Sequence, residues 1–227
     1  MNLLNLNEIA DNFRIRASAA GQLATNDRSG KKMGKTAQGY IETYVKEALY
    51  GRRKEFASKY TDKGLDVEQG AIDYLANARG EFYVKNTERK TDDYFTGEAD
   101  LVHTWRSEIE DIKSSWDCFT FPLFESDLPS KDYFYQGQIY MHLWGLNKAR
   151  FTYVLMNTPD DIAEREIWRK IGSESIFDES MLEQYRYDNV PAELRVKSFA
   201  FDYDPTVIEF LQNRVEEARD YIRTLKF

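Results

Sequence analysis

The hydrophobic periodicity of the chain changes near residue 80, and this change limits its fold more than any other feature. Before residue 80, apolar residues recur at helical spacing, and just after it they alternate as they do in strands. The patterns predict helices over about 37–50, 64–78, 131–146 and 159–170 and from Pro205 onward, and strands over 95–103, 107–113, 151–156 and 196–203. Thr158 is the expected cap of the fourth helix, with Pro159 at its first position. Residues 173–191 fit neither pattern. The order indicates an α/β fold with a central mixed sheet flanked by helices.

Length and composition exclude several classes of protein. The 227 residues suit one domain with a substantial core. The single Cys118 excludes an internal disulfide framework and an all-cysteine zinc or iron–sulfur site within one chain. We assign Cys118, His103 and His142 to packing or surface positions, so any metal would need oxygen ligands. No apolar run reaches the ~20 residues of a membrane helix, and Met1 to Asp11 lacks the features of a secretory signal, so we expect a cytoplasmic protein.

The charge is distributed unevenly along the chain. The formal net charge of −8, taken alone, argues against a nucleic-acid partner, because neutralising phosphates requires Lys and Arg. Residues 1–63, however, hold 12 Lys and Arg against 7 Asp and Glu, a net charge of +5, and the remainder carries −13. The first third of the chain is therefore the candidate region for binding an anionic partner.

Two acids lie on neighbouring predicted strands. Asp111 and Lys113 share a strand face, because side chains two positions apart point the same way. If 98–103 and 108–113 form a hairpin centred near Trp105-Arg106, the numbers of paired residues sum to 211 and Asp100 lies opposite Asp111. Carboxylates at that spacing repel each other unless a cation is shared. The alternative is two solvent-facing acids and an ordinary ion pair on a hairpin.

Two predicted helices add polar side chains. Glu68 shares the apolar face of its helix with Leu65, Ile72 and Leu75, where a carboxylate is rarely left unpaired. It is either a further oxygen ligand or a buried acid paired with an Arg or Tyr. Gln136, on the aromatic-rich helix with Gln138, is either an amide that holds a water or Lys113, or a core-edge amide bonded to backbone.

Together these residues resemble the PD-(D/E)XK nuclease superfamily, most closely the branch of lambda-type phage exonuclease, YqaJ-type viral recombinases and RecB-type nuclease domains. The matching segments are Gly64 to Glu68, Gly97 to Val102, Ile109 to Lys113 and Tyr135 to Tyr140, with Arg16-Ala17-Ser18 similar to the early R-x-S element. The resemblance implies a restriction-endonuclease-like core in a single domain over 1–227. Its parts would be a basic DNA-contact segment (1–63), a catalytic core (64–160) and a C-terminal part (161–227).

The resemblance also implies an activity, a metal and partners. Glu68, Asp100, Asp111 and the Ile112 carbonyl would hold Mg²⁺, for which Mn²⁺ would substitute, while Lys113 and Gln136 would complete the catalytic set. The expected function is a DNA exonuclease acting on ends, 5′ to 3′ on duplex DNA, in phage-type recombination or replication. A homo-oligomeric ring and a single-strand annealing protein would be further partners. The implied DNA-contact residues are Arg14, Arg16, Ser18, Lys31, Lys32 and Lys35.

Two alternatives stay open from the sequence. One is a structure- or site-specific endonuclease of the same fold, and the other is an inactive DNA-binding protein. Asp100 and Asp111 pointing to opposite faces of the sheet would favour the inactive protein. The single Cys118 excludes the iron–sulfur subgroup of the superfamily.

Overall fold

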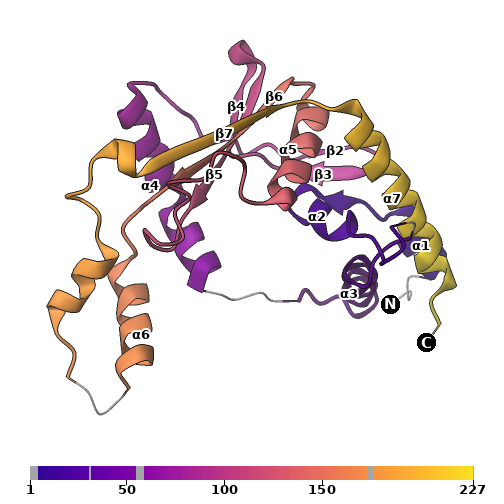
Figure 1. Cartoon of the computed structure of the whole chain (residues 1–227). Coiled ribbons are helices and arrows are strands. Elements are labelled where there is room, and N and C mark those ends of the chain that lie inside the picture. The colour runs from indigo at the N-terminus through magenta and orange to yellow at the C-terminus, as the bar shows by residue number, and fades with distance from the viewer. Residues whose placement is uncertain (1–4, 31, 55–58, 173–175, 227) are drawn as a thin grey trace.

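The computed structural model describes residues 5–30, 32–54, 59–172 and 176–226, without the side chains of 59–62 and 65. A four-stranded sheet in the order β4-β5-β6-β7 lies at its centre (Figure 1). β5 and β6 are parallel and the other two pairings are antiparallel, so the predicted mixed sheet is confirmed. The strands are β4 (Leu101–His103), β5 (Glu108–Ser114), β6 (Lys148–Val154) and β7 (Val196–Asp202).

A second, three-stranded sheet joins the N-terminal segment to the centre of the chain. It consists of β1 (Ile15–Arg16), β2 (Lys90–Thr91) and β3 (Phe95–Gly97), with β1 parallel to β3. The single strand predicted over 95–103 is therefore wrong, because β3 and β4 belong to different sheets. The break has a local cause: Oδ2 of Asp100 accepts the N–H of Ile112 at 2.6 Å, so a side chain takes the place of a backbone carbonyl in the ladder.

The helices are α1 (Leu6–Asp11), α2 (Ala20–Leu23), α3 (Lys35–Tyr50), α4 (Lys59–Arg79), α5 (Lys131–Trp144), α6 (Asp160–Ile171) and α7 (Pro205–Thr224). The five predicted helices agree with α3 to α7 apart from their ends, whereas α1 and α2 were not predicted from the sequence. Short 3₁₀ turns occur at Ala17–Ala19, Thr104–Arg106, Glu179–Tyr185 and Ala192–Leu194. Asp204 caps α7 by accepting the N–H of Thr206 at 2.9 Å. The expected cap of α6 by Thr158 is wrong, because the N-cap is Pro159 and no side chain caps the helix.

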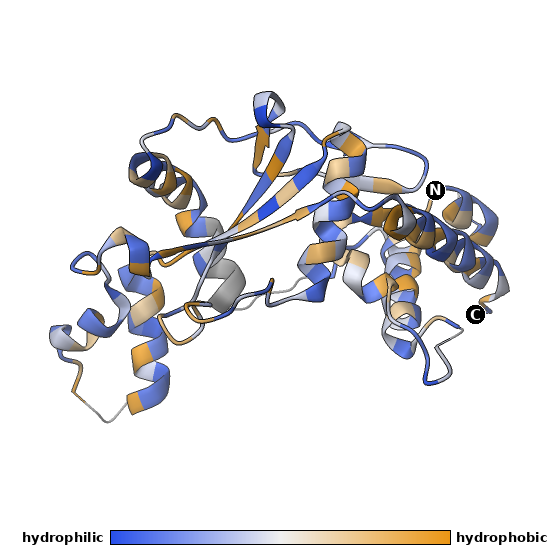
Figure 2. Cartoon of the chain, turned by 45° about the horizontal axis from the view of Figure 1, so that its top comes forward, coloured by the Kyte–Doolittle hydropathy of each residue, from blue (hydrophilic) through white to orange (hydrophobic). Residues whose placement is uncertain are grey.

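The large sheet packs between α4 and α5. Ile112 joins a buried cluster with Ile72 and Leu75 of α4, while Ile109 joins the main core with Ile139 of α5. Odd-numbered and even-numbered residues of β5 thus point to opposite faces of the sheet and contact different helices. Figure 2 shows the corresponding mixture of hydrophobic and hydrophilic residues along the strands. No helix within the described ranges combines the length and the apolar character that crossing a membrane requires.

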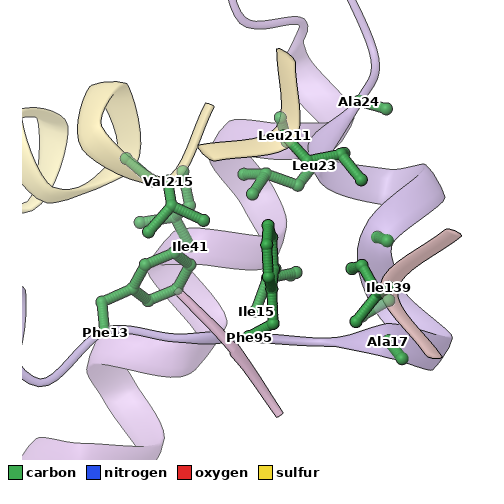
Figure 3. Close-up of a cluster of buried hydrophobic side chains, with 14 of the residues drawn as sticks. Phe13, Ile15, Ala17, Leu23, Ala24, Ile41, Phe95, Ile139, Leu211 and Val215 are labelled. Carbon is green, nitrogen blue, oxygen red and sulfur yellow. The ribbon is translucent and has the colours of Figure 1, made fainter. Parts of the chain in front are cut away.

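The main core brings the two ends of the chain together. Figure 3 shows Phe13 and Ile15 from the N-terminal segment packed with Leu211 and Val215 of α7. Phe95 of β3 lies in the same cluster and is completely buried. The basic N-terminal segment is therefore held firmly beside β3, three residues before Asp100.

Candidate active site

The β4–β5 hairpin brings Asp100 and Asp111 together. Leu101 pairs with Glu110 and Val102 with Ile109, the register predicted from the sequence, although the connection is a 3₁₀ turn followed by Ser107 at φ 52°. Asp100 precedes Leu101, so it faces Asp111 across the hairpin. Burial and the Asp111 carboxylate raise the pKa of Asp100 to about 8, against the opposing effect of the Ile112 N–H. Asp100 and Asp111 therefore share one face of the hairpin, whereas opposite faces would have favoured the inactive protein.

Asp111 is almost completely buried and is held from two sides. Its Oδ1 accepts a hydrogen bond from Nε2 of Gln136 at 3.3 Å, and its Oδ2 lies 2.5 Å from Nζ of Lys113. In the described part of the chain this buried Oδ2 accepts no hydrogen bond of regular geometry. Among the described residues, the close partner of this Oδ2 is therefore the Lys113 ammonium, and the oxygen is of the kind that binds a metal.

Lys113 lies against aromatic rings. Its Nζ is 4.7 Å from the ring centroid of Tyr133 and 5.5 Å from that of Phe151. Burial lowers the pKa of Lys113, but Asp111 and Tyr133 raise it, and the net effect is a pKa above its usual value. Lys113 is consequently a fixed positive charge beside the two acids rather than a neutral base.

Glu68 reaches the same centre from α4. Its charge is one of those that raise the pKa of Asp100, so the two carboxylates are neighbours. Glu68 is half-buried and its Oε2 lies 2.9 Å from Nζ of Lys85. Ile72 and Leu75 are buried as predicted, whereas the side chain of Leu65 is outside the described residues. The partner of Glu68 is neither an Arg nor a Tyr, and no local pattern marked Lys85.

The two glutamines of α5 have different surroundings. Gln136 is buried, and its Nε2 donates to the Tyr140 hydroxyl at 2.9 Å as well as to Asp111. The structure thus shows the amide bonded to Asp111, while the contact with a water or with Lys113 stays a prediction. Gln138 donates to the carbonyl of Asp202 and accepts the N–H of Asp204, so it links α5 to the start of α7.

The donor set fits a hard divalent cation. The buried carboxylate of Asp111 and the half-buried carboxylate of Asp100, with a third acid nearby, are the kind of oxygen ligands that Mg²⁺ selects. The carbonyl of Ile112 points to the β4 edge of the sheet, because the N–H and C=O of one strand residue lie on the same side and its N–H bonds to Asp100. Asp100, Asp111 and the Ile112 carbonyl thus belong to one corner of the sheet, and Glu68 is on the neighbouring helix α4.

A second acidic group lies on the other face of β5. Potential ligand atoms of His103, Glu108 and Glu110 lie within 4.8 Å of one another. Arg79 already neutralises Glu110 at 2.9 Å, and Arg150 binds both oxygens of Glu108, at 3.1 and 2.9 Å. Both carboxylates already form ion pairs with arginines, so we assign a structural role to His103, Glu108 and Glu110.

Arginines line a pocket next to the three-stranded sheet. A cavity of about 480 Å³ is lined by Arg14, Arg16, Arg53 and Arg89, together with Tyr40 and Tyr44. Arg14 and Arg16 belong to the predicted DNA-contact set. Arg53 and Arg89 do not, because Arg53 follows the end of α3 and Arg89 precedes β2, so the two meet only in the folded chain.

The other predicted DNA contacts lie outside this pocket. Ser18 is exposed in its 3₁₀ turn, and Lys32 and Lys35 are exposed at the start of α3. Lys31 lies outside the described residues. Of the residues assigned to packing or surface, His142 bonds to Asp92 and Tyr203, and Cys118 is exposed.

Comparisons with known proteins give structural relatives alone. No family model and no curated protein matches the chain. The crystal structure of a phage-related exonuclease from Haemophilus somnus 129PT matches with a TM-score of 0.78 and 25% sequence identity over 96% of this chain and 97% of that one. The alkaline exonuclease LHK-Exo from Laribacter hongkongensis matches with a TM-score of 0.63 and 14% identity, over 92% and 87% of the two chains. Its complex with dAMP matches with a TM-score of 0.62 and 14% identity, over 96% and 90%. The chain has the lambda-exonuclease-like α/β fold of the PD-(D/E)XK superfamily, as its motifs predicted.

Proposed function

We propose that this chain is a Mg²⁺-dependent DNA exonuclease that hydrolyses phosphodiester bonds from DNA ends, 5′ to 3′ on duplex DNA. The observation that carries the proposal is the meeting of Asp100, Asp111 and Lys113 at one corner of the sheet, in a fold whose solved relatives are described as exonucleases. The role in phage-type recombination or replication follows from the resemblance.

The acids would bind the metal. Asp100, Asp111 and the Ile112 carbonyl would be direct ligands, with Glu68 direct or through water, and Mn²⁺ would substitute because it accepts the same oxygen ligands. Mg²⁺, when bound, supplies an activated water and neutralises charge on the phosphate. Gln136 fixes the rotamer of Asp111 through its 3.3 Å hydrogen bond, so the ligand oxygen is oriented in advance.

Lys113 would act by its charge. Its ammonium is held between Asp111 and the Tyr133 ring, so it can stabilise negative charge that develops on the phosphate without reorganising. From this position it would orient or activate the attacking water.

The arginine pocket would bind the DNA backbone. Arg14, Arg16, Arg53 and Arg89 surround a space large enough for phosphate groups, and the fork-shaped guanidinium suits phosphate oxygens. Phosphate contact would then be local, which reconciles DNA binding with a net charge of −8. A ring of several copies, an annealing-protein partner and a cytoplasmic location remain predictions from the resemblance.

The test uses matched linear and covalently closed circular duplexes with separate 5′ and 3′ end labels, with Mg²⁺ or with EDTA. We expect the linear DNA alone to be degraded, with early loss of the 5′ label and no activity in EDTA. Asp111→Asn and Lys113→Met should each reduce the rate by about 100-fold or more with unchanged circular dichroism. Asp161→Asn, an exposed acid on α6, is the control.

Each contrary result has a defined meaning. Cleavage of the closed circle would replace the exonuclease with an endonuclease of the same fold. Wild-type rates in Asp111→Asn would show that the site is assigned wrongly. Early loss of the 3′ label would reverse the polarity.

A further inference from the structure

Two phenylalanines project into solvent from the loop that joins β5 to α5. The side chains of Phe119 and Phe124 are 92% and 93% exposed. Exposing a phenyl ring is unfavourable by about 2 kcal/mol relative to burying it, so two on one loop call for an explanation.

The loop is anchored on both sides of each ring. Phe121 is buried with Leu155 and Tyr187, and Nζ of Lys197 donates to the carbonyl of Leu123 at 3.3 Å. Around Phe119, the N–H of Thr120 donates to Oδ1 of Asp117 at 2.9 Å. The N–H of Asp117 donates in return to Oγ1 of Thr120 at 3.0 Å. The two rings therefore point outward because their neighbours are held.

Aromatic contacts connect this loop to the candidate active site. Lys113 lies over the ring of Tyr133, which is 6.3 Å from the ring of Tyr153. Tyr153 in turn packs in the cluster that contains Leu123, the residue before Phe124. The charges of Asp111 and of the loop residue Glu125 both raise the pKa of Tyr153, in agreement with this proximity.

The loop lies across the active site from the arginine pocket. Trp116, at the start of the loop, packs against α6, whereas the arginine pocket is lined by α3 and by the β2–β3 sheet. Figure 1 places α3 and α6 at opposite ends of the molecule, with β5 between them. A strand held by the arginines and passing over Asp100 and Asp111 would continue toward Phe119 and Phe124.

The rings, rather than the charges of the loop, would supply the contact with DNA. Asp117, Glu125 and Asp127 lie close to the two rings in the sequence, and carboxylates repel a phosphate backbone. Nucleobases are uncharged and stack on aromatic faces whatever their sequence.

We propose that Phe119 and Phe124 form a stacking surface for unpaired bases of the DNA strand that crosses the active site. The inference rests on the proposed function and extends it, since it gives the protein a way to hold a frayed end. The chemical class of the ligand is a short single-stranded DNA segment next to a duplex.

The test uses duplexes with a four-nucleotide single-stranded end that carries 2-aminopurine, whose fluorescence is quenched by stacking. Every protein also carries Lys113→Met to block cleavage while keeping the carboxylates. We expect quenching with intact Phe119 and Phe124. Phe124→Ala and Phe119→Ala should each abolish part of the quenching and weaken binding by about 5- to 100-fold.

Further variants separate stacking from other roles. Phe124→Tyr should keep the quenching, because it keeps the aromatic face, and Phe124→Leu should lose it although it stays apolar. Phe82→Ala is the matched control, since Phe82 is equally exposed but lies in the segment after α4.

Two results would overturn the inference. One is full quenching and affinity in Phe124→Leu. The other is a change of sedimentation coefficient in the variants with unchanged quenching, which would make the rings a contact between protein copies. Failure of the proposed function would be visible separately, as absence of nuclease activity in the protein with Lys113.

Discussion

Replacing Gly137 with alanine should destabilise the protein, although alanine is the better helix former. Gly137 is in the middle of α5, where the helix packs on β6 and β7. A Cβ atom there would lie 2.6 Å from Cζ of Phe201 and 3.0 Å from both Cβ of Ala149 and Cε2 of Phe151. The Phe201 ring is stacked on Phe151 with an interplanar angle of 10°, so it cannot turn aside without disrupting that stack.

Two opposing contributions decide whether Gly137→Ala raises or lowers the free energy of unfolding. Glycine to alanine within a helix stabilises by about 1 kcal/mol, whereas overpacking a tight contact costs about 1–3 kcal/mol. The approach of 2.6 Å to Cζ of Phe201 is too close for any real Cβ atom, so the cost here is in the upper part of that range, at about 2–3 kcal/mol. We therefore expect Gly137→Ala to lower the free energy of unfolding by about 1–2 kcal/mol. Gly39→Ala in α3 is the matched control, because no heavy atom lies within 4 Å of its added Cβ, and it should stabilise by about 0.5–1 kcal/mol.

Urea denaturation of the wild type and both variants measures this difference. Because Gly137 adjoins Gln136, displacing α5 should also lengthen the hydrogen bond to Asp111 and slow DNA cleavage in the end-labelled assay. The reasoning is refuted if Gly137→Ala is as stable as the wild type or more so while Gly39→Ala shows its gain. In that case the side chains of the sheet adjust to the added methyl group at little cost in free energy, and the packing of α5 at this position is not tight.

Three further predictions concern charge. Lys63 is fully buried, its Nζ donates to the carbonyls of Trp116 and Met156, and burial lowers its pKa to about 8. Between pH 8 and 10.5 the unfolded chain binds a proton that the folded chain lacks, so the free energy of unfolding rises with pH. In urea melts from pH 7 to 9.5, the free energy of unfolding of the wild type should rise by about 2 kcal/mol more than that of Lys63→Met. In thermal melts, Mg²⁺ at 100 times its Kd should stabilise the wild type by about 2.7 kcal/mol, and an equal response in Asp111→Asn would contradict the ligand assignment. Arg16→Gln should lower the slope of log affinity for DNA against log salt by about 1, whereas Arg165→Gln on α6 should not change it.

Local patterns predicted the hairpin register that brings the two candidate acids together. The alternation of side chains and the short connection fixed the pairing of Leu101 with Glu110, and this pairing places Asp100 opposite Asp111. The connection itself is a 3₁₀ turn, but its extra length did not alter the register. The strong period of α5 likewise placed Gln136 on the face that meets β5.

Long-range contacts were beyond prediction from the sequence alone. The break between β3 and β4 depends on a side-chain bond from Asp100 to Ile112, which no propensity encodes. Lys85 finds Glu68 because the segment after α4 turns back beside it. Arg53 and Arg89 meet through the pairing of β1 with β3, a contact that links distant parts of the chain.

The pairing of β1 with β3 also has a consequence for the order of folding. Asp100 and Asp111 are joined by a hairpin, whose short loop closes at little entropic cost. The arginine pocket instead forms only when β1 pairs with β3, which joins Ile15 to Phe95, eighty residues away in the sequence. Contacts between near neighbours in the chain form faster than distant ones. During refolding, the ability to bind a divalent cation should therefore return before the ability to bind DNA.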